Sequence, residues 1–372
     1  MRCNYLKCFI FANASGYGGA ERSLELLIAY WQYHLDLYIF VENKKSYEKL
    51  KHMASQAHVY RLQSGNSLNI HLKNIIFIRH VFFREHPRYW ISNTNKGALY
   101  LSVFKFLYHI PSSNIMVFIR DYQWKYSRLI FSILRDVTIA VPNQATLEYG
   151  KNKKFKFNKK NIYVTDNPVM IHDSLLAENE AGKYDDNKYI VMLANISRWK
   201  GIIYALQAFA LSRLNDNGIK LIVLGKIVDP SYYDECQTYI DKYRLYDSVE
   251  IREFCENTGP IYANCMMLLN TSLAEYGGPE TFGRTIIEAW SYKKPVIAFS
   301  EGGPKYLISD NIDGLLIPEK DVQALASAMN KLVKDSVLRR EMGKAGYEKV
   351  KNRFDSKIVA KNILAYINNH ME

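Results

Sequence analysis

Long apolar runs are missing from this sequence of 372 residues. A helix that crosses a bilayer needs about 18 or more consecutive apolar residues, and no stretch here approaches that length. Cysteine is also scarce, because the chain has only Cys3, Cys8, Cys236, Cys255 and Cys265, and no two of them form a C-x-x-C pair. This pattern argues against both a disulfide framework and a cysteine-type zinc site, so we expect a reducing compartment.

Several catalytic signatures are absent as well. The sequence has no Asp-x-Asp pair, no His-Glu-x-x-His helix, no Walker loop and no Gly-x-Ser-x-Gly turn, and its nine histidines are scattered. These absences argue against zinc-protease, P-loop and serine-hydrolase chemistry. An Asp-x-Asp pair often holds a divalent ion on a diphosphate, so its absence favours a reaction without a metal. We expect no other cofactor.

The amino terminus has the order of a signal peptide without its length. Arg2 and Lys7 precede the apolar run CFIFA, and Ala12-Asn13-Ala14 ends it. The run has about five apolar residues, whereas a signal peptide has about 7–15. We therefore expect a buried first strand at this position.

Charge is unevenly distributed along the chain, whose formal net charge is +12. Residues 1–167 hold 24 lysines and arginines against 10 acidic residues, whereas residues 168–372 hold 25 against 27. Basic residues are concentrated at 44–53, 78–90 and 151–160, with aromatic residues interleaved. This asymmetry predicts an anionic partner for the first half, either a membrane surface or a nucleic acid, with an ordinary solvated basic surface as the alternative.

Short apolar runs alternate with segments of helical periodicity through both halves of the chain. The expected strands are 8–13, 36–42, 89–92, 114–119, 137–141, 161–164, 189–197, 219–225, 249–253, 266–270, 295–299 and 314–318. Such alternation indicates parallel sheets covered by helices on both faces. We therefore predict an α/β protein with two doubly wound Rossmann-like domains, 1–170 and 185–352, joined by a polar segment near 167–187. A last helix, at about 353–372, is expected to pack back on the first domain.

Two glutamates in the second half form the strongest candidate site. Glu280 lies in a loop directly before a predicted helix, and Glu288 follows about two turns further on. Both can face the crevice beyond the carboxyl ends of the strands, which is where open parallel sheets bind ligands. Carboxylates accept hydrogen bonds from paired hydroxyl groups, and Gly283 and the helix start allow an anion to approach closely. An ordinary helix with surface glutamates is the structural alternative.

The segment around these glutamates, PETFGRTIIEAWSYKKPVIAFSEGGPKYLISDNIDGLLIP at 279–318, resembles the signature of retaining glycosyltransferases of the GT-B fold, and family 4 most of all. The likeness rests on the glutamate spacing together with Phe282-Gly283, Pro295-Val296, Gly302-Gly303 and Gly314. The resemblance implies two domains that face each other across a cleft. It also implies a sugar donor linked to UDP, GDP or dTDP, with Glu280 on the sugar, Glu288 on the ribose, and Thr281, Phe282 and Gly283 beside the donor.

The segment VMLANISRWKGIIYALQAFA, at 191–210, resembles the strand, loop and helix that carry the family's Lys-Gly pair, here Lys200-Gly201. In the family this lysine and an arginine five residues earlier hold the donor phosphates. The earlier position is Asn195 in this sequence, so Arg198 is the candidate for the second cation. Cations are needed because the leaving pyrophosphate gains negative charge as the glycosidic bond breaks. A solvated loop lysine is the alternative for Lys200.

Two segments of the first half resemble the family more loosely. SGYGGAERSLELL, at 15–27, resembles the glycine-rich loop before the first helix, where Gly18 and Gly19 permit a tight turn beside a phosphate or sugar. Glu21 occupies the third glycine position of a dinucleotide fingerprint, which argues against that motif. In FIRDYQW, at 118–124, Arg120 stands where many family members have a histidine, so we expect it to line the cleft and to act in catalysis with Glu280 and Lys200. A strand-end Arg–Asp ion pair is the alternative.

The resemblance implies a retaining, metal-independent transfer of a sugar to a glycan or lipid-linked glycan, in bacterial lipopolysaccharide or capsule synthesis. It favours a membrane over a nucleic acid as the anionic partner, so the expected location is the cytoplasm, peripheral on the inner face of the plasma membrane. A sugar-nucleotide epimerase and a non-catalytic binding protein on the same scaffold are the alternatives. A mass shift on a glycan acceptor would exclude the first, and donor hydrolysis or transfer would exclude the second.

Overall fold

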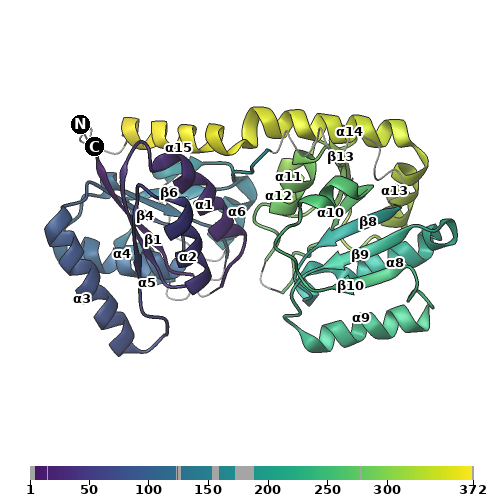
Figure 1. Cartoon of the computed structure of the whole chain (residues 1–372), viewed down its shortest axis with the longest axis horizontal. Coiled ribbons are helices and arrows are strands. Elements are labelled where there is room, and N and C mark those ends of the chain that lie inside the picture. The colour runs from purple at the N-terminus through teal and green to yellow at the C-terminus, as the bar shows by residue number, and fades with distance from the viewer. Residues whose placement is uncertain are drawn as a thin grey trace. The chain divides into compact units, whose positions relative to one another are not determined.

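The computed structural model describes residues 5–14, 16–122, 124, 127–152, 159–171, 188–276 and 278–370. The chain divides into two compact units, each built on its own parallel sheet (Figure 1). The first unit comprises Met1–Pro168 together with Ser356–Glu372, and the second comprises Val169–Asp355. The ranges expected from the sequence were 1–170 and 185–352, and most of the expected joint lies outside the described residues.

A seven-stranded parallel sheet, in the order β3-β2-β1-β4-β5-β6-β7, forms the centre of the first unit. Its strands are β1 (Lys7–Ala12), β2 (Asp36–Val41), β3 (His58–Arg61), β4 (Tyr89–Ser92), β5 (Ile115–Phe118), β6 (Thr138–Val141) and β7 (Ile162–Val164). The helices of this unit are α1 (Gly19–Trp31), α2 (Lys44–Met53), α3 (Leu68–Glu85), α4 (Asn95–Tyr108), α5 (Ser127–Ile133), α6 (Gln144–Asn152) and α15 (Ser356–His370), with short turns η1 (Ser112–Asn114) and η2 (Lys159–Asn161). The strand order reverses between β1 and β4, which is where a doubly wound sheet opens a crevice beyond its strand ends.

Both faces of this sheet are buried. Successive residues of a strand point to opposite faces, so each strand contributes side chains to two apolar clusters. In β1, Phe9 and Phe11 pack into one apolar cluster with Trp90. Cys8 and Ile10 of the same strand pack into a second cluster with residues of α1 and α15. Burial on both sides explains why this strand is continuously apolar in the sequence instead of alternating.

Helix α15 belongs to the first unit although the second unit precedes it in the chain. It packs along α1, where the Trp31 indole Nε1–H donates to the Ala360 carbonyl at 2.9 Å. Val359, Ile363 and Ile367 of α15 are buried in the same cluster as the apolar face of α1. Helix α15 therefore contributes to the core of the first unit, together with α1.

A six-stranded parallel sheet, in the order β10-β9-β8-β11-β12-β13, forms the centre of the second unit. Its strands are β8 (Tyr189–Leu193), β9 (Lys220–Leu224), β10 (Val249–Arg252), β11 (Met267–Asn270), β12 (Val296–Phe299) and β13 (Gly314–Ile317). The helices are α8 (Ile202–Ser212), α9 (Pro230–Lys242), α10 (Gly259–Asn264), α11 (Arg284–Ser291), α12 (Gly303–Leu307), α13 (Val322–Lys334) and α14 (Ser336–Lys349), with turns η3 (Arg198–Lys200), η4 (Leu214–Asn217) and η5 (Val350–Phe354). The order reverses between β8 and β11, as it does between β1 and β4, so the prediction of two doubly wound α/β domains is confirmed.

The sequence prediction missed three short elements. Strand β3 lies at the sheet edge and is exposed at both ends, so it shows no clean apolar alternation. Helices α10 and α12 have six and five residues, too few for helical periodicity to be visible. The predicted strand 189–197 was too long, because β8 ends at Leu193. Most of the basic stretch 151–160 lies outside the described residues, and within the described part of the chain no helix is both long and apolar enough to cross a membrane.

Candidate active site

Two of the predicted donor-binding residues, Lys200 and Glu280, meet where the strand order of the second sheet reverses. Lys200 ends the turn η3, which follows β8, and Glu280 lies in the loop between β11 and α11. Because β8 and β11 are parallel neighbours, both loops leave the sheet at the same edge. That edge is where open doubly wound sheets bind ligands.

Lys200 and Glu280 form an ion pair at this edge. Lys200 Nζ lies 2.6 Å from Glu280 Oε2 and 3.3 Å from Ser272 Oγ. The Ser272 hydroxyl donates to the same carboxylate oxygen at 3.2 Å. The side chains of Lys200 and Glu280 are only 16% and 13% exposed, so solvent screens their charges incompletely. The structure therefore places a cation and a carboxylate together where both side chains are mostly shielded from solvent.

Trp199 connects the two loops that carry this pair. Lys200 Nζ lies 3.7 Å from the centroid of the Trp199 ring, within range of a cation–π interaction. The indole Nε1–H donates to the Gly278 carbonyl at 2.7 Å, in the loop that leads to Glu280. Sequence reasoning passed over Trp199 and Ser272, because their partners lie 79 and 72 positions away in the chain.

Two glycines allow close backbone approach around the pair. Gly201 has a φ of +62°, and a Cβ at this position would collide with the Thr271 carbonyl. A Cβ at Gly303 would collide with the backbone of Phe282, and the Gly303 N–H donates to the Glu280 carbonyl at 2.6 Å. The Gly-Gly pair seen in the sequence thus supports the loop that carries Glu280.

Glu288 lies on α11 and is engaged by two side chains that the sequence analysis did not single out. Arg284 Nε lies 2.8 Å from Glu288 Oε1, and the Tyr262 hydroxyl donates to Oε2 at 3.0 Å. Burial, and after it the charge of Glu288, raises the pKa of Tyr292, whose ring stacks on Tyr262. Since Arg284 is the first residue of α11, it adds a second cation at the edge where Lys200 lies.

Thr281, Phe282 and Gly283 form the turn that leads into α11. Phe282 is buried and packs edge-on against Phe354, with ring centroids 5.9 Å apart. Gly283 caps the helix with a φ of +94°, a conformation that favours glycine. The turn therefore presents backbone groups at a helix start, while its one large side chain points into the core.

Arg198 has one acidic partner on α9 and another at the N-cap of that helix. Its Nη1 lies 2.7 Å from Glu235 Oε2, and its Nε lies 3.9 Å from Asp229 Oδ2. Asn195, the residue that replaces the family's arginine, is exposed after the end of β8. The structure thus brings Lys200 to Glu280 but gives Arg198 two other carboxylates as partners.

In the first unit, the predicted glycines stand at the start of α1. Gly18 is the N-cap of α1 and Gly19 is its first residue. The Gly18 N–H donates to Glu21 Oε2 at 2.8 Å. Glu21, which stands where a dinucleotide fingerprint has its third glycine, therefore stabilises the loop from the first turn of α1. Burial raises the pKa of the Glu21 carboxyl above its ordinary value.

Arg120 follows β5 and is linked to the same helix start through Asn93. The Arg120 Nε–H donates to Asn93 Oδ1 at 3.1 Å, and Asn93 Nδ2 donates to the Ala20 carbonyl at 3.2 Å. Arg120 Nη1 also donates to the Oδ1 of Asn167, which follows β7. The structure therefore joins Arg120 and the glycine loop in one polar network at the β1–β4 reversal.

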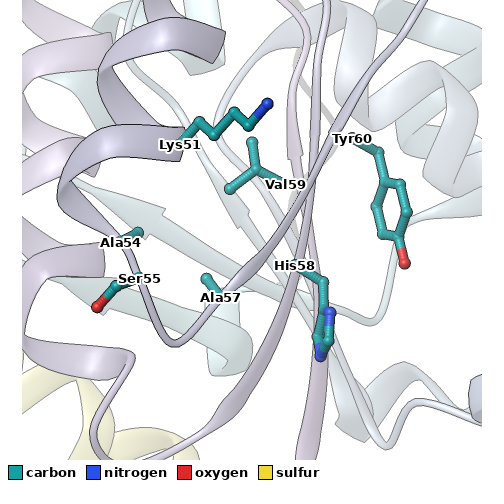
Figure 2. Close-up of a pocket in the computed structure, with 7 residues that line it drawn as sticks. All are labelled: Lys51, Ala54, Ser55, Ala57, His58, Val59 and Tyr60. Atoms are coloured by element: carbon teal, nitrogen blue, oxygen red, sulfur yellow. The ribbon is translucent and has the colours of Figure 1, made fainter.

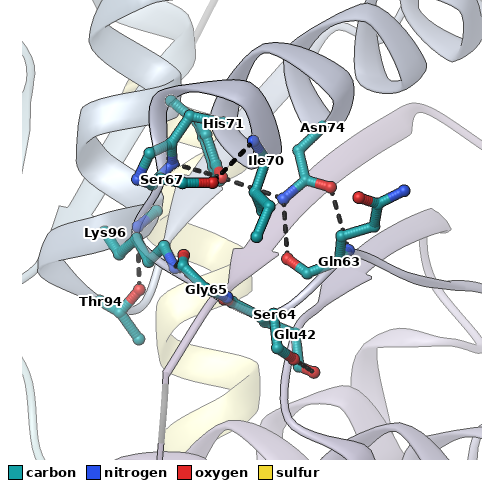
Figure 3. A network of polar contacts seen from close by, with 12 residues as sticks. Glu42, Gln63, Ser64, Gly65, Ser67, Ile70, His71, Asn74, Thr94 and Lys96 are labelled. Atoms are coloured by element: carbon teal, nitrogen blue, oxygen red, sulfur yellow. Dashed lines mark hydrogen bonds and ion pairs between the residues drawn. The ribbon is translucent and has the colours of Figure 1, made fainter.

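A further polar network lies beyond β2, at the same edge of the first sheet (Figure 3). Lys96 Nζ donates to Glu42 Oε1 at 2.6 Å and to the Gly65 carbonyl at 2.7 Å. Within the described parts of the chain, Glu42 Oε2 and the buried side-chain amide of Asn13 have no hydrogen-bond partner. Unpaired buried polar atoms are rare in folded proteins.

A separate pocket lies beside the last turn of α2 (Figure 2). It is lined by Lys51, Ala54, Ser55, Ala57, His58, Val59 and Tyr60. It is near the amino-terminal end of β3 and has no carboxylate in its lining, so it is distinct from the two candidate sites. Across the described ranges, no group of three or more histidine, cysteine or acidic side chains is arranged to hold a metal ion.

The similarity to known protein families lies in the second unit. Residues 175–349 match the family model "Glycosyl transferases group 1". The chain is 30% identical over 175 residues to an exopolysaccharide phosphotransferase of Streptomyces coelicolor, covering 47% of this chain and 18% of that protein. It is 24% identical over 235 residues to the capsular polysaccharide biosynthesis glycosyltransferase CapM of Staphylococcus aureus, covering 63% of this chain and 58% of that protein. The chain thus spans less than two thirds of these curated relatives.

Solved structures match the chain over nearly its whole length. The crystal structure of Anabaena HepE in complex with UDP and glucose has a TM-score of 0.81 and 18% identity, and the match covers 98% of this chain and 100% of that one. At this identity the likeness shows the fold, which is GT-B. The chain therefore has the GT-B fold, and residues 175–349 of its second unit are similar to the glycosyl transferases group 1 family.

Proposed function

We propose that this protein is a retaining glycosyltransferase that moves a sugar from a nucleotide-sugar to a glycan or lipid-linked glycan without a metal ion. The observation that carries the proposal is the Lys200–Glu280 pair at the β8–β11 reversal, inside the domain that matches the family. The names of the relatives support a role in bacterial surface polysaccharide synthesis. They include CapM and a poly(ribitol-phosphate) alpha-N-acetylglucosaminyltransferase, both of Staphylococcus aureus.

The charges of the second unit suit the two ends of such a donor. Lys200 stabilises the negative charge that develops on the leaving diphosphate, with Arg284 as a further cation at the same edge. Glu280 accepts hydrogen bonds from the sugar hydroxyls, and Glu288 accepts them from the ribose. Because Lys200 and Glu280 now neutralise each other, an arriving donor separates them and gives each a new partner.

The first unit is proposed to bind the acceptor. Arg120 and the loop before α1 supply a cation and a helix start at the β1–β4 reversal. The Asn13 amide and Glu42 Oε2 offer unfilled hydrogen-bonding capacity for acceptor hydroxyls. A lipid-linked acceptor resides in a bilayer while the donor is a dissolved nucleotide, so we place the enzyme in the cytoplasm, on the inner face of the plasma membrane.

A donor screen tests the proposal. The full chain is incubated with UDP-, GDP- and dTDP-sugars, and thermal unfolding and nucleotide release are measured with and without a chelator. UDP-sugars are the first choice, since HepE is crystallised with UDP and glucose. We expect one nucleotide class to raise the unfolding temperature, because a ligand that binds only the folded state stabilises it. Failure of every donor to bind would overturn the proposal, a strict metal requirement would overturn its metal-free form, and rearrangement of the donor sugar would indicate an epimerase.

A further inference from the structure

The outward face of α3 is apolar where a surface helix is normally polar. Leu68, Leu72, Ile76 and Phe83, which we call the α3 outer stripe, are between 47% and 74% exposed. The first three are four residues apart, a spacing that places them on one side of a helix, and Phe83 falls on the same side two turns later. The helix lies at the outer margin of the first unit (Figure 1).

The stripe differs from the buried face by which α3 is attached to its domain, although its last member, Phe83, also packs edge-on against Tyr108 with ring centroids 5.4 Å apart. Asn74, Ile78 and Val81 form the buried face of the helix, and Asn74 Nδ2 donates to the Gln63 carbonyl at 3.0 Å. Single exposed apolar side chains are common on protein surfaces, but four on one side of the same helix mark a surface that meets something apolar. The helix is thus seated on one side and presents a second apolar face on the other.

The charges on the exposed side of α3 are of one sign. Lys73 and Arg79 are exposed on this side of the helix, and Arg84 is exposed with its Nε 2.6 Å from Oε1 of Glu85. The only acidic residue in the helix is Glu85, whose side chain is 15% exposed and lies 3.0 Å from Lys7 Nζ. The face therefore combines aliphatic and aromatic side chains with cations, and its one carboxylate is turned toward its own domain.

We propose that the α3 outer stripe docks the protein on the surface of an anionic lipid bilayer. Apolar side chains enter the boundary between headgroups and acyl chains, and cations beside them meet lipid phosphates. A second copy of this chain fits less well, since two such faces would bring like charges together. A nucleic acid also fits less well, because three of the four stripe residues are aliphatic and only Phe83 offers a ring on which a base can stack. The inference does not depend on the proposed transferase activity.

Vesicle binding by the full chain tests this surface. Sedimentation is measured with vesicles of equal parts phosphatidylcholine and phosphatidylglycerol, and with vesicles of phosphatidylcholine alone. We expect binding to the anionic vesicles that weakens with added salt. The double substitution Leu72→Asp/Ile76→Asp is expected to weaken the partition by at least about tenfold, because two charged groups replace apolar ones at the lipid boundary. Leu211→Asp/Val337→Asp, at exposed apolar positions of the second unit, is the matched control and is expected to bind as the wild type does.

Charge reversal at an exposed position provides a second variant, one that leaves the buried core unchanged. Lys73→Glu changes one exposed side chain and is expected to weaken binding to anionic vesicles about fivefold or more. Equal binding of the wild type and the double variant would overturn the proposal, and so would equal binding to neutral and anionic vesicles. Self-association of the wild type in buffer that the double variant abolishes would also overturn it, in favour of an interface between copies.

Discussion

The ammonium group of Lys200 lies 2.6 Å from Oε2 of Glu280, although 80 positions separate the two residues in the chain. The turn after β8 and the loop after β11 bring them together, because these strands are neighbours in the sheet. Ser272 lies within hydrogen-bonding distance of both side chains. The pair therefore joins the two parts of the family signature in one place, and several of its consequences can be measured.

The first prediction concerns the charge of Glu280. Glu280→Gln keeps the shape of the side chain and one acceptor oxygen but removes the negative charge that orders Lys200 and the sugar hydroxyls. We expect transfer to fall by at least about 100-fold, while the free energy of unfolding changes by no more than about 2 kcal/mol. Nucleotide release and urea denaturation measure the two effects. The control is Glu301→Gln, an exposed glutamate of the same unit; undiminished turnover in Glu280→Gln would contradict the assignment.

Trp199 is predicted to act as a positioning residue. Trp199→Phe keeps an aromatic face near Lys200 but removes the 2.7 Å hydrogen bond to the Gly278 carbonyl. The loss of one hydrogen bond corresponds to about 1 kcal/mol, so we expect the KM for the donor to rise about fivefold with a smaller change in kcat. Steady-state kinetics measure both constants, and Tyr243→Phe, at an exposed position of α9's end, is the control. A drop in kcat with an unchanged KM would mean that Trp199 does not position the donor.

The third prediction separates backbone strain from steric collision. Gly201 and Gly218 both have positive φ, at +62° and +70°. A Cβ at Gly218 meets nothing within 4 Å, whereas a Cβ at Gly201 collides with the Thr271 carbonyl. Gly218→Ala should therefore cost only the conformational strain, about 1 kcal/mol, and Gly201→Ala should cost at least about 2 kcal/mol more. Urea denaturation of both variants measures the difference, and equal costs would show that the close approach at Gly201 relaxes freely.

The fourth prediction concerns pH. Burial raises the pKa of Glu21 above its ordinary value of 4.5, so the folded state holds this proton more tightly than the unfolded state does. The stability that Glu21 contributes is therefore present below pH 4.5 and is lost as the pH rises from there through the raised pKa.

Glu21→Gln removes this titration and keeps an oxygen that accepts from the Gly18 N–H. We expect the variant to gain stability relative to the wild type as the pH rises from 4 to 7, and thermal unfolding across that range measures the gain. Glu48→Gln, at an exposed position of α2, is the control. The difference in unfolding temperature between Glu21→Gln and the wild type could instead stay constant with pH. That result would show that the folded and unfolded states bind the Glu21 proton equally.

Much of the architecture was predictable because it depends on local patterns. Apolar runs such as CFIFA are continuous, since each strand is buried on both faces, and their alternation with helical segments indicates parallel sheets. The missed elements lack that signal, as β3 is an exposed edge strand and α12 has only five residues. The roles proposed for Glu280, Lys200 and Arg120 came from family likeness, and the Glu280→Gln kinetics test the first of them.

The sequence by itself determined two doubly wound domains and a loop that carries Glu280, because periodicity and glycine positions act over a few residues. Only the tertiary structure decided the partners. It paired Arg198 with Glu235 and Arg284 with Glu288. It also placed Trp199 between the two loops of the donor site. The physical reason is that ion pairs and hydrogen bonds depend on distance in space. Parallel strands joined by helices bring together residues that are tens of positions apart in the chain.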